Sequence, residues 1–234
     1  PKSRKYNKSL SFIEDGFLAC SKNALDLVGA AEKLSAENYH AQCLSLSVLA
    51  LEEMGKMYFI DGLLFAKSDG MKSEYFSKSL RSHNVKLSAV PMISALSVMV
   101  ARSDPRFDKL EIFRRALAIG HENWKLAGQE VLDLAGHENF EFLDRWKQSG
   151  FYVSLLNGNK FQSPRDGVDP ALSECVRKFA QMSASNLEFA FSDGNLQRYM
   201  AQAKSIRSKL SEKDHQLLEE NAEEMIEYLF GSED

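Results

Sequence analysis

Apolar side chains recur at three- and four-residue spacing along most of the chain, the periodicity of helices with one buried face. Proline and glycine are sparse, so few positions force a helix to end. Ser35 offers an N-cap for a second helix, and Pro91 is expected to bend or restart a third, since proline removes one helical hydrogen bond. The pattern predicts helices over 9–34, 35–67, 73–101, 108–135, 138–148, 170–191, 195–210 and 211–230.

The segment 149–170 breaks this periodicity. It is rich in glycine and proline and carries one β-favouring patch, Phe151-Tyr152-Val153. We expect an ordered loop there, with a short strand or hairpin. The chain is therefore predicted to be all-α and one domain over 1–234, with a core bundle in 1–148, the ordered loop in 149–170, and C-terminal helices in 171–234 packed on the bundle.

Composition and charge narrow the class of protein. Hydrophobic residues make up 44% and charged residues 26% of the chain, which is typical of a globular domain. A formal net charge of -4 argues against a protein that coats nucleic acid with its whole surface, but it does not exclude a local basic groove. Cys20, Cys43 and Cys175 are far apart, so we expect buried small hydrophobes in a reducing compartment. No apolar run of about 20 residues occurs, which predicts a cytoplasmic protein without a membrane span.

Charged residues stand in an unexpected place on the second predicted helix. At about 100° per residue, Glu52, Glu53 and Lys56 share a sector of roughly 100° with aliphatic side chains. The other faces are apolar too, so this helix should be central and its charges paired. Glu52 and Lys56 could instead form an ordinary surface pair. Gly55, in the same turn, indicates close approach of another backbone or a ligand.

The third predicted helix repeats the anomaly. His83 and Lys86 are three residues apart, and apolar residues flank His83 on the helix surface. His83 is either a hydrogen-bonded core residue or a general acid–base, because a histidine among charged groups can change protonation near neutral pH. We therefore predict one interior polar cluster of Glu52, Glu53, Lys56, His83 and Lys86.

These motifs resemble the AbiV family of bacterial abortive-infection proteins, which belongs to the HEPN helical superfamily. The resemblance is carried by EEMGK at 52–56, HNVK at 83–86 and KQSGFYV at 147–153, and it spans about 17–179. It implies an all-helical bundle that forms a homodimer and acts as a toxin-like effector, arresting growth when a phage infects. A phage-encoded activator protein and RNA are the partners that it implies.

Many HEPN relatives are metal-independent ribonucleases with an Arg-x(4–6)-His motif. In this chain Arg114 or Arg115 with His121 has that spacing. Arg145 stands where the order along the chain would place the motif, but Phe151 and Tyr152 follow it at that spacing instead of a histidine. The resemblance thus leaves two functions open. One is an RNA-cleaving growth-arrest toxin, with Arg115 and His121 added to the candidate catalytic residues. The other is a non-enzymatic effector that binds a phage protein or the translation machinery through helix faces.

Metal and cofactor chemistry have little support in the sequence. Glu37 with His40, and Glu212 with His215, have the spacing of di-iron ligands, but both pairs lie near predicted helix starts, where acidic residues are common. Phosphate-cradling, dinucleotide and serine-hydrolase motifs are missing. We therefore expect neither a cofactor nor a metal.

Overall fold

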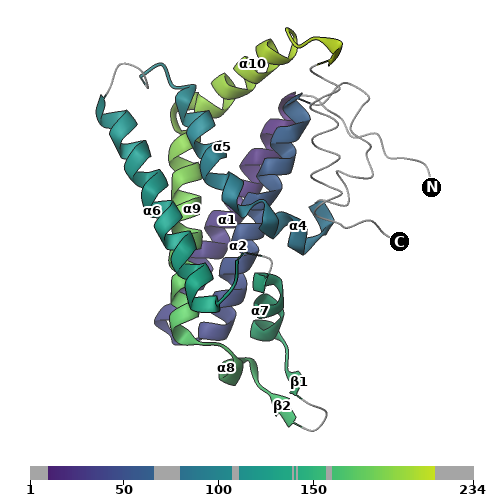
Figure 1. Ribbon diagram of the computed structural model, residues 1–234, viewed down its shortest axis with the longest axis vertical. Coiled ribbons are helices and arrows are strands. Elements are labelled where there is room, and N and C mark those ends of the chain that lie inside the picture. The colour runs from purple at the N-terminus through teal and green to yellow at the C-terminus, as the bar shows by residue number, and fades with distance from the viewer. Residues whose placement is uncertain are drawn as a thin grey trace, which may run out of the picture.

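The computed structural model describes residues 10–65, 80–106, 111–138, 140, 142–156 and 160–213. These residues form a bundle of helices with one small hairpin (Figure 1). The long helices are α1 (Leu10–Ala36), α2 (His40–Phe65), α6 (Glu111–Ala135) and α9 (Pro170–Phe191). The shorter helices are α4 (His83–Ser88), α5 (Val90–Arg102), α7 (Phe142–Phe151), α8 (Pro164–Gly167) and α10 (Asn195–Arg207). The predicted all-α class is confirmed.

Helix α2 lies at the centre of the bundle. It packs against α1, α9, α7, α5 and α4, so apolar side chains on nearly all of its faces are buried. Fully buried examples are Leu44, Val48, Leu51, Met54 and Met57. This confirms the central position expected from a helix that is apolar nearly all round. Helix α9, from the segment 171–234, runs beside α2 and also contacts α1, α5 and α6, and thus belongs to the core.

The turn between α1 and α2 differs from the prediction. Ser35 does not cap α2; it lies in the last turn of α1, and its hydroxyl donates to Glu174 on α9 at 3.2 Å. The chain reverses at Asn38, which adopts a positive φ of 62°. Asparagine tolerates this left-handed conformation better than most residues, so the reversal falls three residues after the expected cap.

The break predicted near Pro91 is present. Ala89 separates α4 from α5, and Pro91 occupies the first turn of α5. A proline there removes an N–H group that has no helical partner in any case. Ser82 caps α4 by accepting a hydrogen bond from the Val85 N–H group. Residues 73–79 of the predicted third helix lie outside the described residues.

The hairpin expected in 149–170 is also present, but its strands are displaced along the chain. Strands β1 (Ser154–Leu156) and β2 (Lys160–Gln162) pair antiparallel, with Leu155 opposite Phe161. Phe151 of the β-favouring patch instead ends α7, because the helical hydrogen bonds of α7 continue to Tyr152, whose N–H group donates to the Gln148 carbonyl. Figure 1 shows the hairpin projecting from the end of the bundle opposite α10.

The remaining boundary predictions hold to within a few residues where they can be compared. Helix α10 ends at Arg207 rather than at residue 210, and most of the predicted helix over 211–230 lies outside the described residues. All three cysteines are free and buried, as expected. None of the helices in the described ranges is long and apolar enough to cross a membrane.

Candidate functional site

Five titratable side chains meet where α4 and α7 pack against α2. Glu52 on α2 is 2% exposed, and Lys86 on α4 and Lys147 on α7 are 4% and 3% exposed. Lys147 Nζ lies 2.5 Å from Glu52 Oε1, and Lys86 Nζ lies 3.0 Å from Glu52 Oε2. His83 Nδ1 lies 2.7 Å from Glu52 Oε2, and Asp144 Oδ1 lies 2.7 Å from Lys147 Nζ. We call these five residues the Glu52 cluster.

Two glycines allow the three helices to come this close. A Cβ atom on Gly55 would lie under 3.0 Å from the carbonyl oxygen of Lys86, so α4 can rest on α2 only because Gly55 has no side chain. A Cβ atom on Gly150 would lie under 3.0 Å from both Ser45 Oγ and the Ala41 carbonyl oxygen, which brings α7 against the start of α2. The expectation that another backbone approaches Gly55 is confirmed.

The charges of the Glu52 cluster balance one another. Two carboxylates, Glu52 and Asp144, face two ammonium groups, Lys86 and Lys147. Burial alone would raise the pKa of Glu52, but hydrogen bonds from Lys147 and His83 and the charges of both lysines lower it below its ordinary value. Glu52 is therefore ionised at neutral pH and compensates the charges of both buried lysines, of which only Lys147 has a second carboxylate, Asp144, beside it.

His83 sits at the edge of the cluster, with its ring 45% exposed. Its Nδ1 atom lies 2.7 Å from Glu52 Oε2 and 2.9 Å from Lys147 Nζ. Nδ1 can donate to Glu52 when it carries a proton, or accept from Lys147 when it does not. Both partners hold the ring in the same orientation, so the tautomer can change without moving the side chain.

A metal ion would compete with an ammonium group in this cluster. Glu52, His83 and Asp144 place ligand atoms within 4.8 Å of one another, which is close enough for a shared cation. However, Lys147 Nζ contacts the same three side chains at 2.5, 2.9 and 2.7 Å. Its charge already occupies the position that a cation would take, and a divalent ion would have to displace it.

The structure divides the predicted five-residue cluster into two groups. Glu52, His83 and Lys86 meet as expected. Glu53 and Lys56 instead pair with each other at 2.5 Å on the side of α2 that faces α1. There burial and the Glu53 charge raise the pKa of the Cys20 thiol to about 11. The alternative surface pair of Glu52 with Lys56 is also wrong, because Glu52 points to α4 and α7.

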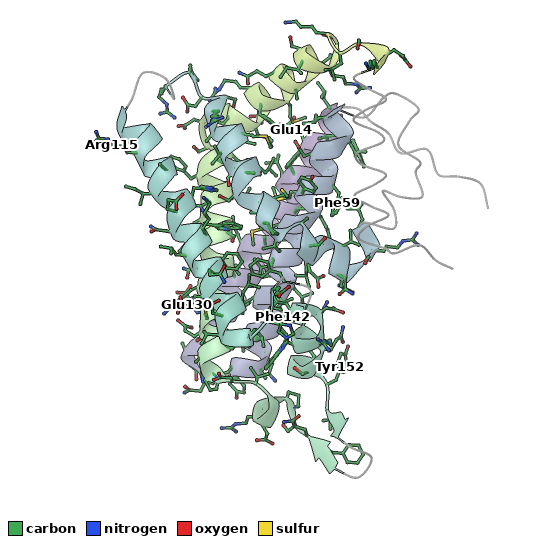
Figure 2. The ribbon with its side chains drawn as sticks, in the orientation of Figure 1. Glu14, Phe59, Arg115, Glu130, Phe142 and Tyr152 are labelled. Atoms are coloured by element: carbon green, nitrogen blue, oxygen red, sulfur yellow. The ribbon has the colours of Figure 1, made fainter. Side chains whose placement is uncertain are left out.

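Arg115 and His121 do not come together within the chain. Six residues apart, they differ by about 120° around an ideal helix. Arg115 is exposed and points outward from α6 in Figure 2, whereas His121 faces the bundle and its Nδ1 lies 2.5 Å from Ser94 Oγ on α5. The described residues therefore do not assemble this spacing into a single site.

Sequence reasoning missed Lys147 and Asp144. Lys147 was part of a motif that carried the family resemblance, but its helix is amphipathic and short, so a lysine there predicts a solvated side chain. The signal that could have found it is the i,i+3 spacing of Asp144 and Lys147 on one helix face. Only the approach of α7 to α2 shows that Lys147 is buried.

A second buried acid, Asp61, was also missed. Asp61 on α2 is 7% exposed and accepts a hydrogen bond of 2.7 Å from the Tyr199 hydroxyl on α10. Burial raises the pKa of Asp61 to about 6, although the bond from Tyr199 opposes this shift. In contrast to Glu52, no lysine or arginine among the described residues pairs with Asp61.

Asp61→Asn is expected to become more stable relative to the wild type as the pH rises. The folded state favours protonated Asp61, because its pKa of about 6 exceeds the ordinary 3.8. Wild-type stability is therefore lost as the pH rises from about 4 through about 6, whereas the amide does not titrate. The relative gain by pH 7.5 should be on the order of 2 kcal/mol, measured by urea denaturation at both ends of this range. Tyr39→Phe, which alters an exposed tyrosine, is the control. If the difference in stability between Asp61→Asn and the wild type is the same at every pH, Asp61 does not have the raised pKa.

The fold and the Glu52 cluster together define the class of protein: an all-α, HEPN-like helical bundle with an internal carboxylate–lysine–histidine cluster. The chain belongs to the AbiV family, whose family model (HEPN_AbiV) matches residues 12–185. This match contains the EEMGK, HNVK and KQSGFYV motifs and ends within α9, so α10 lies beyond it. No curated protein and no solved structure matches the chain significantly.

Proposed function

We propose that this AbiV-family protein is an abortive-infection effector that arrests growth by cleaving RNA without a metal ion. The observation that supports it best is the half-exposed His83, held by Glu52 and Lys147 through one ring nitrogen. RNA carries its own nucleophile in the 2′-hydroxyl group, so cleavage needs a residue that moves protons and is open to solvent.

The bond from Nδ1 to Glu52 lets His83 serve first as the base and then as the acid in such a reaction. When Nδ1 donates to Glu52, the other ring nitrogen, Nε2, has a free lone pair and can take the proton of the 2′-hydroxyl. The imidazolium that forms keeps its Nδ1–H bond to Glu52 and returns the Nε2 proton to the departing 5′-oxygen. Glu52, Lys86 and Lys147 are positioning residues in this proposal, because their charged groups are buried behind the ring.

His83→Ala is expected to lower RNA cleavage by about 100-fold or more, the usual contribution of a positioned acid–base residue. Purified protein is incubated with total RNA in EDTA, and products are resolved by gel electrophoresis. His137→Ala is the matched control, because His137 is exposed and its ring stacks on Phe142 instead of bonding a residue of the Glu52 cluster. His121→Ala tests the alternative histidine.

Three outcomes would contradict this proposal in different ways. If cleavage requires an added divalent ion, the metal-free mechanism is excluded. Cleavage that survives His83→Ala would place the chemistry elsewhere. No cleavage by a protein that still arrests growth in cells would favour the non-enzymatic alternative.

A second function, binding of a phage protein or the translation machinery, has its own support. Large apolar side chains are exposed around the end of α7 and on the hairpin, a pattern typical of contact surfaces. They are Phe151, Tyr152, Val153 and Phe161. A phage-encoded activator protein is the partner that we propose for this surface.

Homodimer formation is also part of the proposal. The outward face of α6 carries Ile119, Leu126 and Leu134, which are 61%, 69% and 51% exposed. By helical periodicity these three side chains share one face, about opposite His121. An exposed apolar stripe of this kind supports contact with a second copy.

A further inference from the structure

A cavity of about 160 Å³ lies between α5, α6 and α9, on different helices from the Glu52 cluster. Val98 and Phe189 supply apolar surface, and Phe189 is 43% exposed. Ser94, His121 and Asn186 supply polar surface. The cavity thus joins an apolar lining with a few polar groups, as small-ligand sites usually do.

Two of the polar groups have hydrogen-bonding capacity that the protein does not use. The Asn186 side chain makes no hydrogen bond within the described part of the chain, although its amide offers both a donor and an acceptor. His121 bonds Ser94 through Nδ1, and its Nε2 atom has no partner within the described ranges. Ser97 also lines the cavity, but its hydroxyl already donates to carbonyl groups of α5. Asn186 and His121 therefore point to a ligand with complementary polar atoms.

Charge and size restrict that ligand. None of the described residues that line the cavity is an aspartate, glutamate, lysine or arginine, so an anion or a divalent cation would lose its hydration without a compensating charge. A cavity of about 150 Å³ is large enough to hold benzene. The space here therefore fits one neutral six-membered ring.

We propose that this cavity binds a neutral planar ring with a lactam edge, of the size and chemistry of uracil. The adjacent C=O and N–H groups of a lactam match the donor and acceptor of the Asn186 amide. Nε2 of His121 bonds a further polar atom of the ring, and Phe189 and Val98 contact its apolar surface. The ring can belong to a free nucleoside or to an unpaired base of RNA, since both present the same edge.

Gly120 keeps this cavity open at a cost in helix stability. It lies within α6 and lines the cavity, and a Cβ atom there would meet only Asn186 Oδ1, at 3.5 Å. Alanine therefore fits without strain and should stabilise α6, because it is the better helix former. The added methyl group would narrow the cavity beside the Asn186 amide. Gly120→Ala consequently separates loss of binding from loss of folding.

The proposal is tested by titrating the full chain with uridine, using calorimetry and saturation-transfer NMR. Uridine is expected to bind through its base, whereas ribose 5-phosphate, which has no base, should not bind. Asn186→Ala should weaken uridine binding about tenfold, because the lactam edge loses both hydrogen bonds. Gly120→Ala should weaken binding while raising the melting temperature. Asn123→Ala, an exposed asparagine on α6, should change neither.

Hexauridylate distinguishes the two sources of the ring. Tighter binding than uridine, with the same dependence on Asn186, identifies an RNA base; binding of uridine alone identifies a free nucleoside. No uridine binding at millimolar concentration, or binding that Asn186→Ala and Gly120→Ala leave unchanged, would overturn the proposal. Because uridine has no phosphodiester bond, the uridine titrations do not depend on RNA cleavage, and either proposal can fail while the other stands.

Discussion

Glu52→Ala is expected to destabilise the folded protein by about 3–5 kcal/mol, the usual cost of leaving buried charges without their partner. Lys86 and Lys147 are 4% and 3% exposed, and both direct Nζ at the Glu52 carboxylate. Asp144 remains beside Lys147, but no carboxylate among the described residues then remains beside Lys86. The free energy of unfolding is measured by urea denaturation at pH 7.5, followed by circular dichroism.

The adjacent Glu53→Ala is the matched control. Glu53 pairs with Lys56, whose side chain is 25% exposed and can turn to water, so its loss should cost less than about 1 kcal/mol. Similar losses in the two variants would mean that Glu52 is not the counter-charge of the cluster.

A combined variant separates charge from packing. Glu52→Leu with Lys86→Met and Lys147→Met removes all three charges and keeps similar volumes. It should recover most of the stability that Glu52→Ala loses, because apolar replacements of a buried ion pair are often neutral or better. It should also lose any activity that depends on an oriented His83. If the combined variant is as unstable as Glu52→Ala, the charged hydrogen bonds of the cluster stabilise the fold beyond balancing one another's charge.

Gly55→Ala is expected to destabilise the protein by about 2 kcal/mol or more, although alanine is the better helix former. The new methyl group would fall on the Lys86 backbone, where α4 rests on α2. A backbone carbonyl cannot turn aside as a side chain can, so α4 must move. His83 and Lys86 would move with α4 and leave Glu52, so RNA cleavage, if it uses His83, should fall as well.

Gly29→Ala on α1 is the control for Gly55→Ala. A Cβ atom at Gly29 meets nothing within 4 Å, so the change should stabilise the protein by up to about 1 kcal/mol. The two glycine replacements are thus expected to shift the melting temperature in opposite directions. A shift of the same sign in both would mean that α4 does not depend on close approach at Gly55.

How far the sequence could predict the candidate site depended on which helix each residue occupies. Glu52 and His83 could be found because charged groups on otherwise apolar faces must be paired inside the fold. Lys147 could not be found this way, since α7 is short and amphipathic and a lysine on such a helix usually meets water. The sequence could also not predict that Glu53 and Glu52 belong to different groups of charges. Adjacent residues differ by about 100° around a helix, and only the packing of α1 and α4 on different sides of α2 assigns one carboxylate to each.

The sequence by itself determined the all-α class, the central position of α2, the break before Pro91 and the presence of a loop with some β structure in 149–170. Each of these follows from local chemistry: periodicity, the missing N–H group of proline, and the turn residues of the loop. Tertiary structure alone decided which charges meet, that Asp61 is buried beside Tyr199, and that Asn186 and His121 face one cavity. Contacts between helices far apart in the chain depend on how closely backbones approach, and at Gly55 and Gly150 that distance is set by the absence of a single carbon atom.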